Sequence, residues 1–209
     1  MVGRIIETDE DVAEGTAHLV AVEPRFAEAL ALTGPPPLRR RGDGFETLLS
    51  AIVSQQVSTA SATAIWGRVV ALGATEPAAY LAATDEALRA AGLSRQKIAY
   101  GRSLAGSGLD FAALRELPDD EVVATLIGLK GIGVWTAEIY AMFSLGRADV
   151  FAPGDLALQD AARELFALES RPSERVLREM SLAWSPWRSV AARLLWAYYR
   201  TFNRREGVR

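Results

Sequence analysis

A glycine-containing turn in the middle of the chain constrains the fold more than any other feature of the sequence. It lies within LIGLKGIGVWTAEIY, residues 126–140, where Gly131 and Gly133 are two residues apart. A helix is predicted before the turn, from about Asp119 to Ile127, and a very apolar helix after it, from Val134 to about Leu145. Two helices joined by so short a turn form an αα-hairpin, so helix packing must organise this part of the chain.

Helical signals extend along the rest of the sequence. Five apolar residues follow the spacing of an amphipathic helix, namely Phe45, Leu48, Leu49, Ile52 and Val53. Residues that favour helix starts (Ser58, Thr84, Ser94) alternate with glycines that favour helix ends (Gly73, Gly92, Gly108). The alternation typical of strands is absent, so the sequence predicts an all-α fold.

The composition excludes several kinds of site. The 209 residues include no cysteine, which rules out disulfides, thiolate zinc sites and iron–sulfur clusters. They include one histidine, His18. The surroundings of His18 favour a packed or surface role over catalysis. No apolar stretch is long enough to span a bilayer and the N-terminus has no signal-peptide pattern. We expect a cytoplasmic protein without a membrane partner, associated with the nucleoid if the source is bacterial.

The hairpin glycines have two interpretations. Without side chains, Gly131 and Gly133 let the backbone approach a phosphate, and the helix that follows offers unpaired N–H groups. Lys130, inside the turn, suits a phosphate or solvent, and Leu129 and Ile132 would anchor the hairpin to the core. Taken alone, the glycines are equally explained by the tight turn itself.

The net charge of −3 requires that any field attracting DNA be local. The segment from Met180 to Arg205 has no acidic residue and contains Arg188, Arg193, Arg200, Arg204 and Arg205. It is either a DNA-facing patch or a solvated basic helix end.

Four stretches together resemble the helix-hairpin-helix, Gly/Pro-Asp (HhH-GPD) DNA glycosylase superfamily. One is the hairpin with its Thr-Ala helix, followed about 20 residues later by Asp155. The others are similar to the 3-methyladenine DNA glycosylase II, or AlkA-type, branch: Phe45–Ser58 (FETLLSAIVSQQVS), Asp149–Asp155 (DVFAPGD) and Trp184–Trp196 (WSPWRSVAARLLW). They span roughly residues 44–200.

The resemblance implies a fold and an activity. The fold is a helix-hairpin-helix glycosylase domain over residues 1–209, with one helical lobe of about residues 45–140, a second of about 1–44 plus 141–209, and the active-site cleft between them. The activity is that of a monofunctional, monomeric glycosylase in base excision repair. It would flip alkylated purines, such as 3-methyladenine and 7-methylguanine, out of double-stranded DNA and hydrolyse the N-glycosidic bond without a cofactor.

The resemblance places the catalytic carboxylate at Asp155. Cleavage of the glycosidic bond develops positive charge on the sugar, and one carboxylate can stabilise it and orient the attacking water. Asp155 also precedes a helix predicted from Leu156 to Phe166, where Asp is a common N-cap, and the two roles are compatible. Asp149 is expected to close a turn, and Asp160 to lie within the following helix.

The resemblance also assigns two indoles to the base pocket. Trp196 would stack on the flipped base and Trp135 would line the pocket near Asp155. Glycosylases that also nick the strand have a lysine at the position of Trp135, so no lyase activity is expected. The AlkA-type pattern has a tyrosine at Ile139, a departure that bears on substrate range. The remaining tryptophans, Trp66, Trp184 and Trp187, are assigned to the core.

Further residues are expected to contact DNA. Gln56 falls where the family inserts a wedge into the gap left by the flipped base, although an AlkA-type protein would have leucine there. Its neighbour Gln55, Ser58 and Thr136 are counted with the hairpin as DNA contacts, and helix capping explains Ser58 equally well. The family hairpin also implies a structural Na⁺ or K⁺, held by the backbone carbonyls of Ile127, Leu129 and Ile132.

Two other functions fit parts of the sequence. A non-catalytic helix-hairpin-helix module would need the hairpin but has no use for Asp155, Trp135 and Trp196 at matching spacings. An endonuclease III-like or adenine-mismatch glycosylase is disfavoured because the cluster cysteines are missing.

Overall fold

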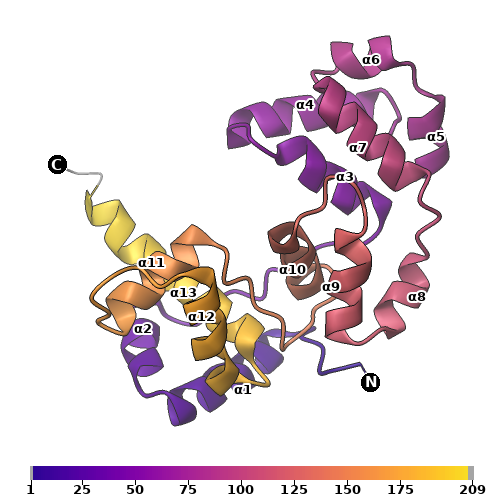
Figure 1. Ribbon diagram of the computed structural model, residues 1–209. Coiled ribbons are helices and arrows are strands. Elements are labelled where there is room, and N and C mark those ends of the chain that lie inside the picture. The colour runs from indigo at the N-terminus through magenta and orange to yellow at the C-terminus, as the bar shows by residue number, and fades with distance from the viewer. Residues whose placement is uncertain (1, 207–209) are drawn as a thin grey trace. The chain divides into compact units, whose positions relative to one another are not determined.

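The computed structural model, described here over residues 2–206, is built from helices (Figure 1). In chain order they are α1 (Asp9–Val22), α2 (Arg25–Thr33), α3 (Phe45–Ser54), α4 (Thr59–Ala71), α5 (Pro77–Ala82), α6 (Asp85–Ala90), α7 (Arg95–Ala105), α8 (Phe111–Glu116), α9 (Asp119–Ile127), α10 (Val134–Phe143), α11 (Leu156–Leu165), α12 (Glu174–Ser181), the 3₁₀ helix η1 (Leu182–Trp184) and α13 (Arg188–Glu206). Within residues 2–206 no β-strand forms, and an isolated bridge joins Ile5 to Arg147. The predicted all-α fold is confirmed.

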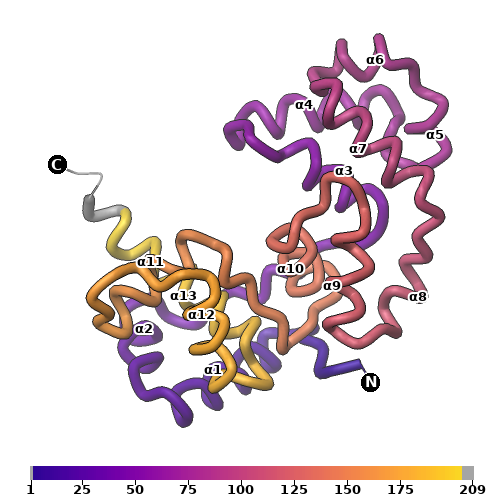
Figure 2. Tube along the Cα trace, viewed as in Figure 1, coloured from indigo at the N-terminus to yellow at the C-terminus, as the bar shows by residue number. Residues whose placement is uncertain are grey.

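The chain divides into two compact units. Unit 1 is Arg41–Tyr140, which holds α3 to α9 and most of α10. Unit 2 combines Val2–Arg40 with Ala141–Arg209, so that α1 and α2 pack against α13 from the other end of the chain (Figure 2). The first division falls at residues 40/41, a few residues before the boundary expected near residue 44.

Local sequence signals explain where the helices begin. Ser58, Thr84 and Ser94 are N-caps, and their side chains accept hydrogen bonds from backbone N–H groups of the helices they precede. Two predicted helix ends were too late. The helix expected to reach Leu145 ends at Phe143, because the chain turns so that the Arg147 N–H donates to the Ala141 carbonyl. The helix expected to reach Phe166 ends at Leu165, one residue earlier.

Each unit has its own apolar core. In unit 1 the predicted apolar face of α3 is buried against α4 and α7, and Leu48, Leu49, Ile52 and Val53 are inaccessible to solvent. In unit 2 Trp184 lies edge-on to Phe26 and Phe151. Trp184 and Trp187 are buried as predicted, whereas Trp66 is half-buried.

The basic segment near the C-terminus is not a uniform surface patch. Arg193 is 1% exposed, and Arg188 forms an ion pair with Asp149 in which Nε and Oδ1 are 2.8 Å apart. Arg200 is exposed, and the side chains of Arg204 and Arg205 lie outside the described residues. Both interpretations of the segment, a DNA-facing patch and a solvated helix end, are therefore wrong for Arg193, because its side chain is buried in the core of unit 2.

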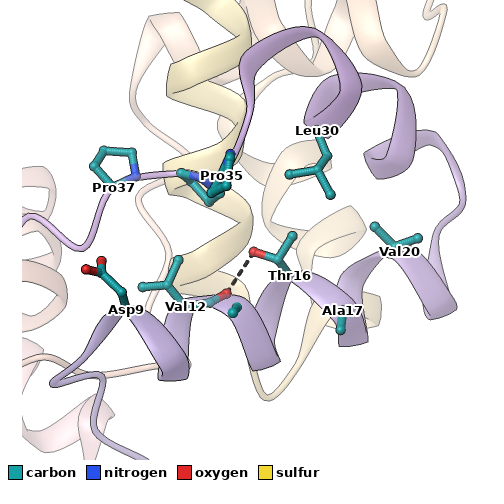
Figure 3. Close-up of a pocket in the computed structure, with 10 residues that line it drawn as sticks. Asp9, Val12, Thr16, Ala17, Val20, Leu30, Pro35 and Pro37 are labelled. Carbon is teal, nitrogen blue, oxygen red and sulfur yellow. Dashed lines mark hydrogen bonds between the residues drawn. The ribbon is translucent and has the colours of Figure 1, made fainter.

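Unit 2 contains a pocket of about 730 Å³ whose lining includes none of the predicted site residues (Figure 3). Its walls are formed by α1, α2 and a run of three prolines, residues 35–37, called the proline run. Val12, Val20 and Leu30 are among the other lining residues. The Thr16 hydroxyl in its wall donates to the Val12 carbonyl. The walls are thus mainly apolar.

None of the described helices has both the length and the apolar character needed to cross a bilayer.

Candidate functional site

The two hairpin glycines serve different purposes. Gly131 has φ +89°, and a Cβ there would lie 2.4 Å from the ring of Tyr100 on α7, so the fold admits only glycine. A Cβ on Gly133 would have no heavy atom within 4 Å, and Gly133 is exposed. Gly131 therefore allows the turn to pack closely, while Gly133 leaves the backbone accessible to a large ligand.

The helix after the turn presents its N-terminus at this surface. The Ala137 N–H donates to the Gly133 carbonyl at 3.0 Å, and the N–H groups that precede it belong to the first turn of α10, beyond the helical ladder. Lys130 is exposed, whereas Ile132 is 4% exposed and anchors the turn as predicted. Thr136 is 8% exposed, so any contact it makes with DNA would have to run through its backbone.

The predicted wedge segment is tied to the hairpin. Gln55 is the C-cap residue that follows α3, and its side-chain Nε2 donates to the Gly131 carbonyl at 2.8 Å. Gln56 follows with φ +55°, and its side chain is exposed. Ser58 caps α4 by accepting from the Ser61 N–H, which confirms its capping role. Gln55 thus holds the loop that presents Gln56.

The sequence gives no signal for Lys97, which also supports this loop. Lys97 lies in the first turn of α7, and its Nζ donates to the Val53 carbonyl at 2.7 Å. Partial burial lowers the pKa of Lys97. It lines a polar pocket of about 320 Å³ together with Gln55, Gln56, Tyr100 and Gly131, among others. This pocket connects the wedge segment, α7 and the hairpin within unit 1.

In unit 2 the structure brings Asp155 and Trp196 together. Asp155 is half-buried and is the N-cap of α11. Its Oδ1 accepts hydrogen bonds from the Ala157 N–H at 3.0 Å and the Leu158 N–H at 3.1 Å. The Trp196 Nε1–H of α13 donates to the same oxygen at 3.2 Å. The predicted N-cap role of Asp155 is confirmed, and the carboxylate is fixed by three N–H groups.

The other predicted residues near this site have different surroundings. Asp149 accepts from the Ser185 hydroxyl at 2.8 Å and pairs with Arg188, as expected of a residue that closes a turn. Asp160 lies within α11, 3.7 Å from Arg171. Trp135, in contrast, belongs to unit 1, where it is 48% exposed near the start of α10. Indoles usually pack in the core, so the exposure of Trp135 beside the hairpin glycines favours a binding role over a packing role.

The turn also offers carbonyl oxygens to a cation. Ile127 ends α9 and Ile132 precedes α10, and no backbone N–H of the described chain is seen to donate to either carbonyl. The Leu129 carbonyl accepts from the Ile132 N–H at 3.1 Å. Neutral carbonyl oxygens of this kind suit a hard monovalent cation, so the residues predicted for such a site fit it chemically.

Helices α9 and α10, joined by the turn that contains Gly131 and Gly133, form a helix-hairpin-helix motif. The model of the HhH-GPD superfamily of base excision DNA repair proteins matches residues 49–186. The chain belongs to this superfamily, as its sequence predicted.

Solved structures and curated relatives agree with this membership. A DNA-3-methyladenine glycosidase from Bacillus halodurans superposes with a TM-score of 0.83 at 38% identity, over 91% of both chains. The Schizosaccharomyces pombe 3-methyladenine DNA glycosylase Mag1, in complex with abasic DNA, gives a TM-score of 0.74 at 28% identity over 88% of this chain and 95% of that chain. The DNA-3-methyladenine glycosylase 2 of Escherichia coli is 29% identical over 92% of this chain and 80% of its own.

The two glycines should respond differently to alanine. We expect Gly131→Ala to lower the free energy of unfolding by about 2–3 kcal/mol, because the new methyl group meets Tyr100 at a residue with positive φ. Gly133→Ala has open space around the new Cβ and should change it by less than about 0.5 kcal/mol. Urea unfolding measures both. Equal stabilities for the two variants would contradict this assignment of roles.

Proposed function

We propose that this protein is a monofunctional DNA glycosylase that removes alkylated purines, of the 3-methyladenine and 7-methylguanine class, from double-stranded DNA. The observation that carries the proposal is the Asp155 carboxylate, held at the start of α11 by three N–H groups. The names of the relatives support the substrate class, since the relatives described above are 3-methyladenine glycosylases or glycosidases.

The chemistry of base loss explains why one carboxylate suffices. As the N-glycosidic bond lengthens, positive charge develops on the sugar. A carboxylate fixed before the reaction begins stabilises that charge without reorganisation, and it can also orient the attacking water. Alkylation at N3 or N7 makes the purine cationic, so that it leaves without a strong general acid. His18, whose Nε2 lies 3.2 Å from the Ser185 carbonyl, is not needed for this step.

The hairpin would bind the DNA backbone. The exposed Gly133, the first turn of α10 and Lys130 offer backbone N–H groups and one cation to a phosphate. Gln56, exposed and presented by the Gln55–Gly131 hydrogen bond, would enter the gap left by the flipped base. A Na⁺ or K⁺ on the carbonyls of the turn would add positive charge beside that phosphate and take no part in bond cleavage.

The aromatic residues favour binding of a cationic base and hydrolysis of its N-glycosidic bond. Trp135 and Trp196 are each proposed to contact the base, because an electron-rich indole attracts an electron-deficient alkylated purine. Trp135 also occupies the position of the Schiff-base lysine of strand-nicking relatives. Lys130 lies in the exposed turn instead. We therefore propose that the product is an abasic site in an unbroken strand.

The catalytic role of Asp155 is tested by Asp155→Asn, which retains an N-capping side chain. We expect base release from a 3-methyladenine duplex to fall by about 100-fold or more under single-turnover conditions, with DNA binding retained. Asp160→Asn, on the same helix, is the control and should react at the parental rate. Release at the parental rate by Asp155→Asn would refute the assignment.

The reaction type is tested on duplexes that each carry one lesion, including 3-methyladenine, 7-methylguanine and 8-oxoguanine. We expect release of the methylated bases only, with strand breaks appearing after alkali treatment and not before it. Breaks without alkali that are trapped by borohydride would contradict hydrolysis, because they require a Schiff base with a lysine.

A further inference from the structure

We propose that Trp196 is a positioning residue for the Asp155 carboxylate, and that Phe143 and the buried Arg193 hold its indole in place. This inference rests on the proposed function and assigns Trp196 a second role besides contact with the base. Arg193, Phe143 and Trp196 together form what we call the indole clamp.

The first contact joins the indole to the carboxylate. Two of the three N–H groups on Asp155 Oδ1 belong to the backbone of α11 and are fixed by the helix itself. The third, from Trp196, comes from α13 and approaches as a side chain at 3.2 Å. Backbone donors alone hold Oδ1 near the helix end, whereas a donor from a second helix also restricts rotation of the carboxyl plane. The Trp196 donor therefore helps to orient the carboxylate.

The second contact holds the indole against α10. Arg193 and Trp196 are three residues apart on α13 and therefore share a helix face. Both contact Phe143, the last residue of α10, which is 4% exposed. The Trp196 and Phe143 ring centroids are 5.7 Å apart with an interplanar angle of 36°. The Arg193 guanidinium carbon lies 4.6 Å from the centroid of Phe143.

The surroundings of Arg193 are unusual for a cation. Its side chain donates to the Leu38, Ser189 and Met142 carbonyls at 3.0, 2.9 and 3.3 Å, and to the Ser189 hydroxyl. Among the side chains of residues 2–203, no carboxylate is in ion-pair range of it. Burial lowers the pKa of Arg193 to about 10, so it stays charged at neutral pH.

A buried guanidinium without an acid costs free energy that an apolar side chain of similar volume would avoid. What this one provides is a rigid link. Its fork joins the segment after the proline run, the end of α10 and the first turn of α13. Because Phe143 and Trp196 sit on two of these elements, Arg193 holds Phe143 and the Trp196 indole in a fixed relation to each other.

The decisive variant is Trp196→Phe, which retains an aromatic ring but removes the N–H donor. The readout is the affinity for two abasic duplexes without a base, one with a protonated pyrrolidine and one with a neutral tetrahydrofuran in place of the sugar. A misplaced carboxylate stabilises the cation less, so we expect the preference for the pyrrolidine duplex to fall about tenfold in Trp196→Phe. We also expect the single-turnover rate of 7-methylguanine release at neutral pH to fall about tenfold. Trp187→Phe, which removes a buried indole elsewhere in unit 2, should leave the preference for the pyrrolidine duplex unchanged.

A second variant tests the clamp. Arg193→Met replaces the guanidinium with an apolar chain, and we expect a several-fold slower release together with a several-fold smaller preference for the pyrrolidine duplex. Thermal unfolding in parallel shows that the variant is folded under the assay conditions. A preference for the pyrrolidine duplex that is unchanged in Arg193→Met would remove Arg193 from the proposal.

The outcomes separate the two proposals. Wild-type protein that releases no methylated base would overturn the proposed function and this inference with it. Wild-type activity together with an unchanged preference for the pyrrolidine duplex in Trp196→Phe would overturn the positioning role alone. A loss of that preference in Trp196→Phe that is absent from Trp187→Phe would support it.

Discussion

The hydrogen bonds between the Asp155 carboxylate and the first turn of α11 are the interaction on which the account depends. They satisfy two N–H groups that every helix start leaves unpaired, and they place a negative charge where the helix dipole favours it. The same bonds fix the carboxylate before any substrate arrives. One interaction thus serves the fold of unit 2 and the proposed chemistry, which explains how a site without histidine or cysteine ligands can be built from a helix cap.

Unit 1 also has a helix start at its predicted site, but there the unpaired N–H groups face outward instead of binding a carboxylate of the protein. The start of α10 carries no acidic cap, and the exposed Gly133 leaves its first turn accessible to an anion from outside. The Gln55 side chain links this turn to the loop of Gln56, so the residues proposed to bind the phosphate and to enter the base stack are joined by one hydrogen bond. A protein of net negative charge can therefore offer local backbone dipoles to a DNA phosphate.

Much of this could be predicted from the sequence, because it depends on short-range rules. The helix caps, the hairpin, the family and the N-cap role of Asp155 follow from residue types at fixed spacings. The different roles of Gly131 and Gly133 did not, since they depend on Tyr100, which is distant in the chain. The indole–carboxylate hydrogen bond also depends on how α13 packs against α11. Arg193 is the clearest example of what the sequence could not predict. Its charge indicated a position on the surface, but its place on α13 buries it in the core of unit 2.

The most direct test of the central claim compares two abasic duplexes that differ in the charge of the sugar analogue. A pyrrolidine analogue carries a protonated ring nitrogen and resembles the sugar cation, whereas tetrahydrofuran is neutral and keeps the same phosphate contacts. Wild-type protein should bind the pyrrolidine duplex about 100-fold more tightly or better, as expected of a transition-state mimic, and Asp155→Asn should reduce that preference to nearly one. A preference that survives intact in Asp155→Asn would show that another group stabilises the sugar cation.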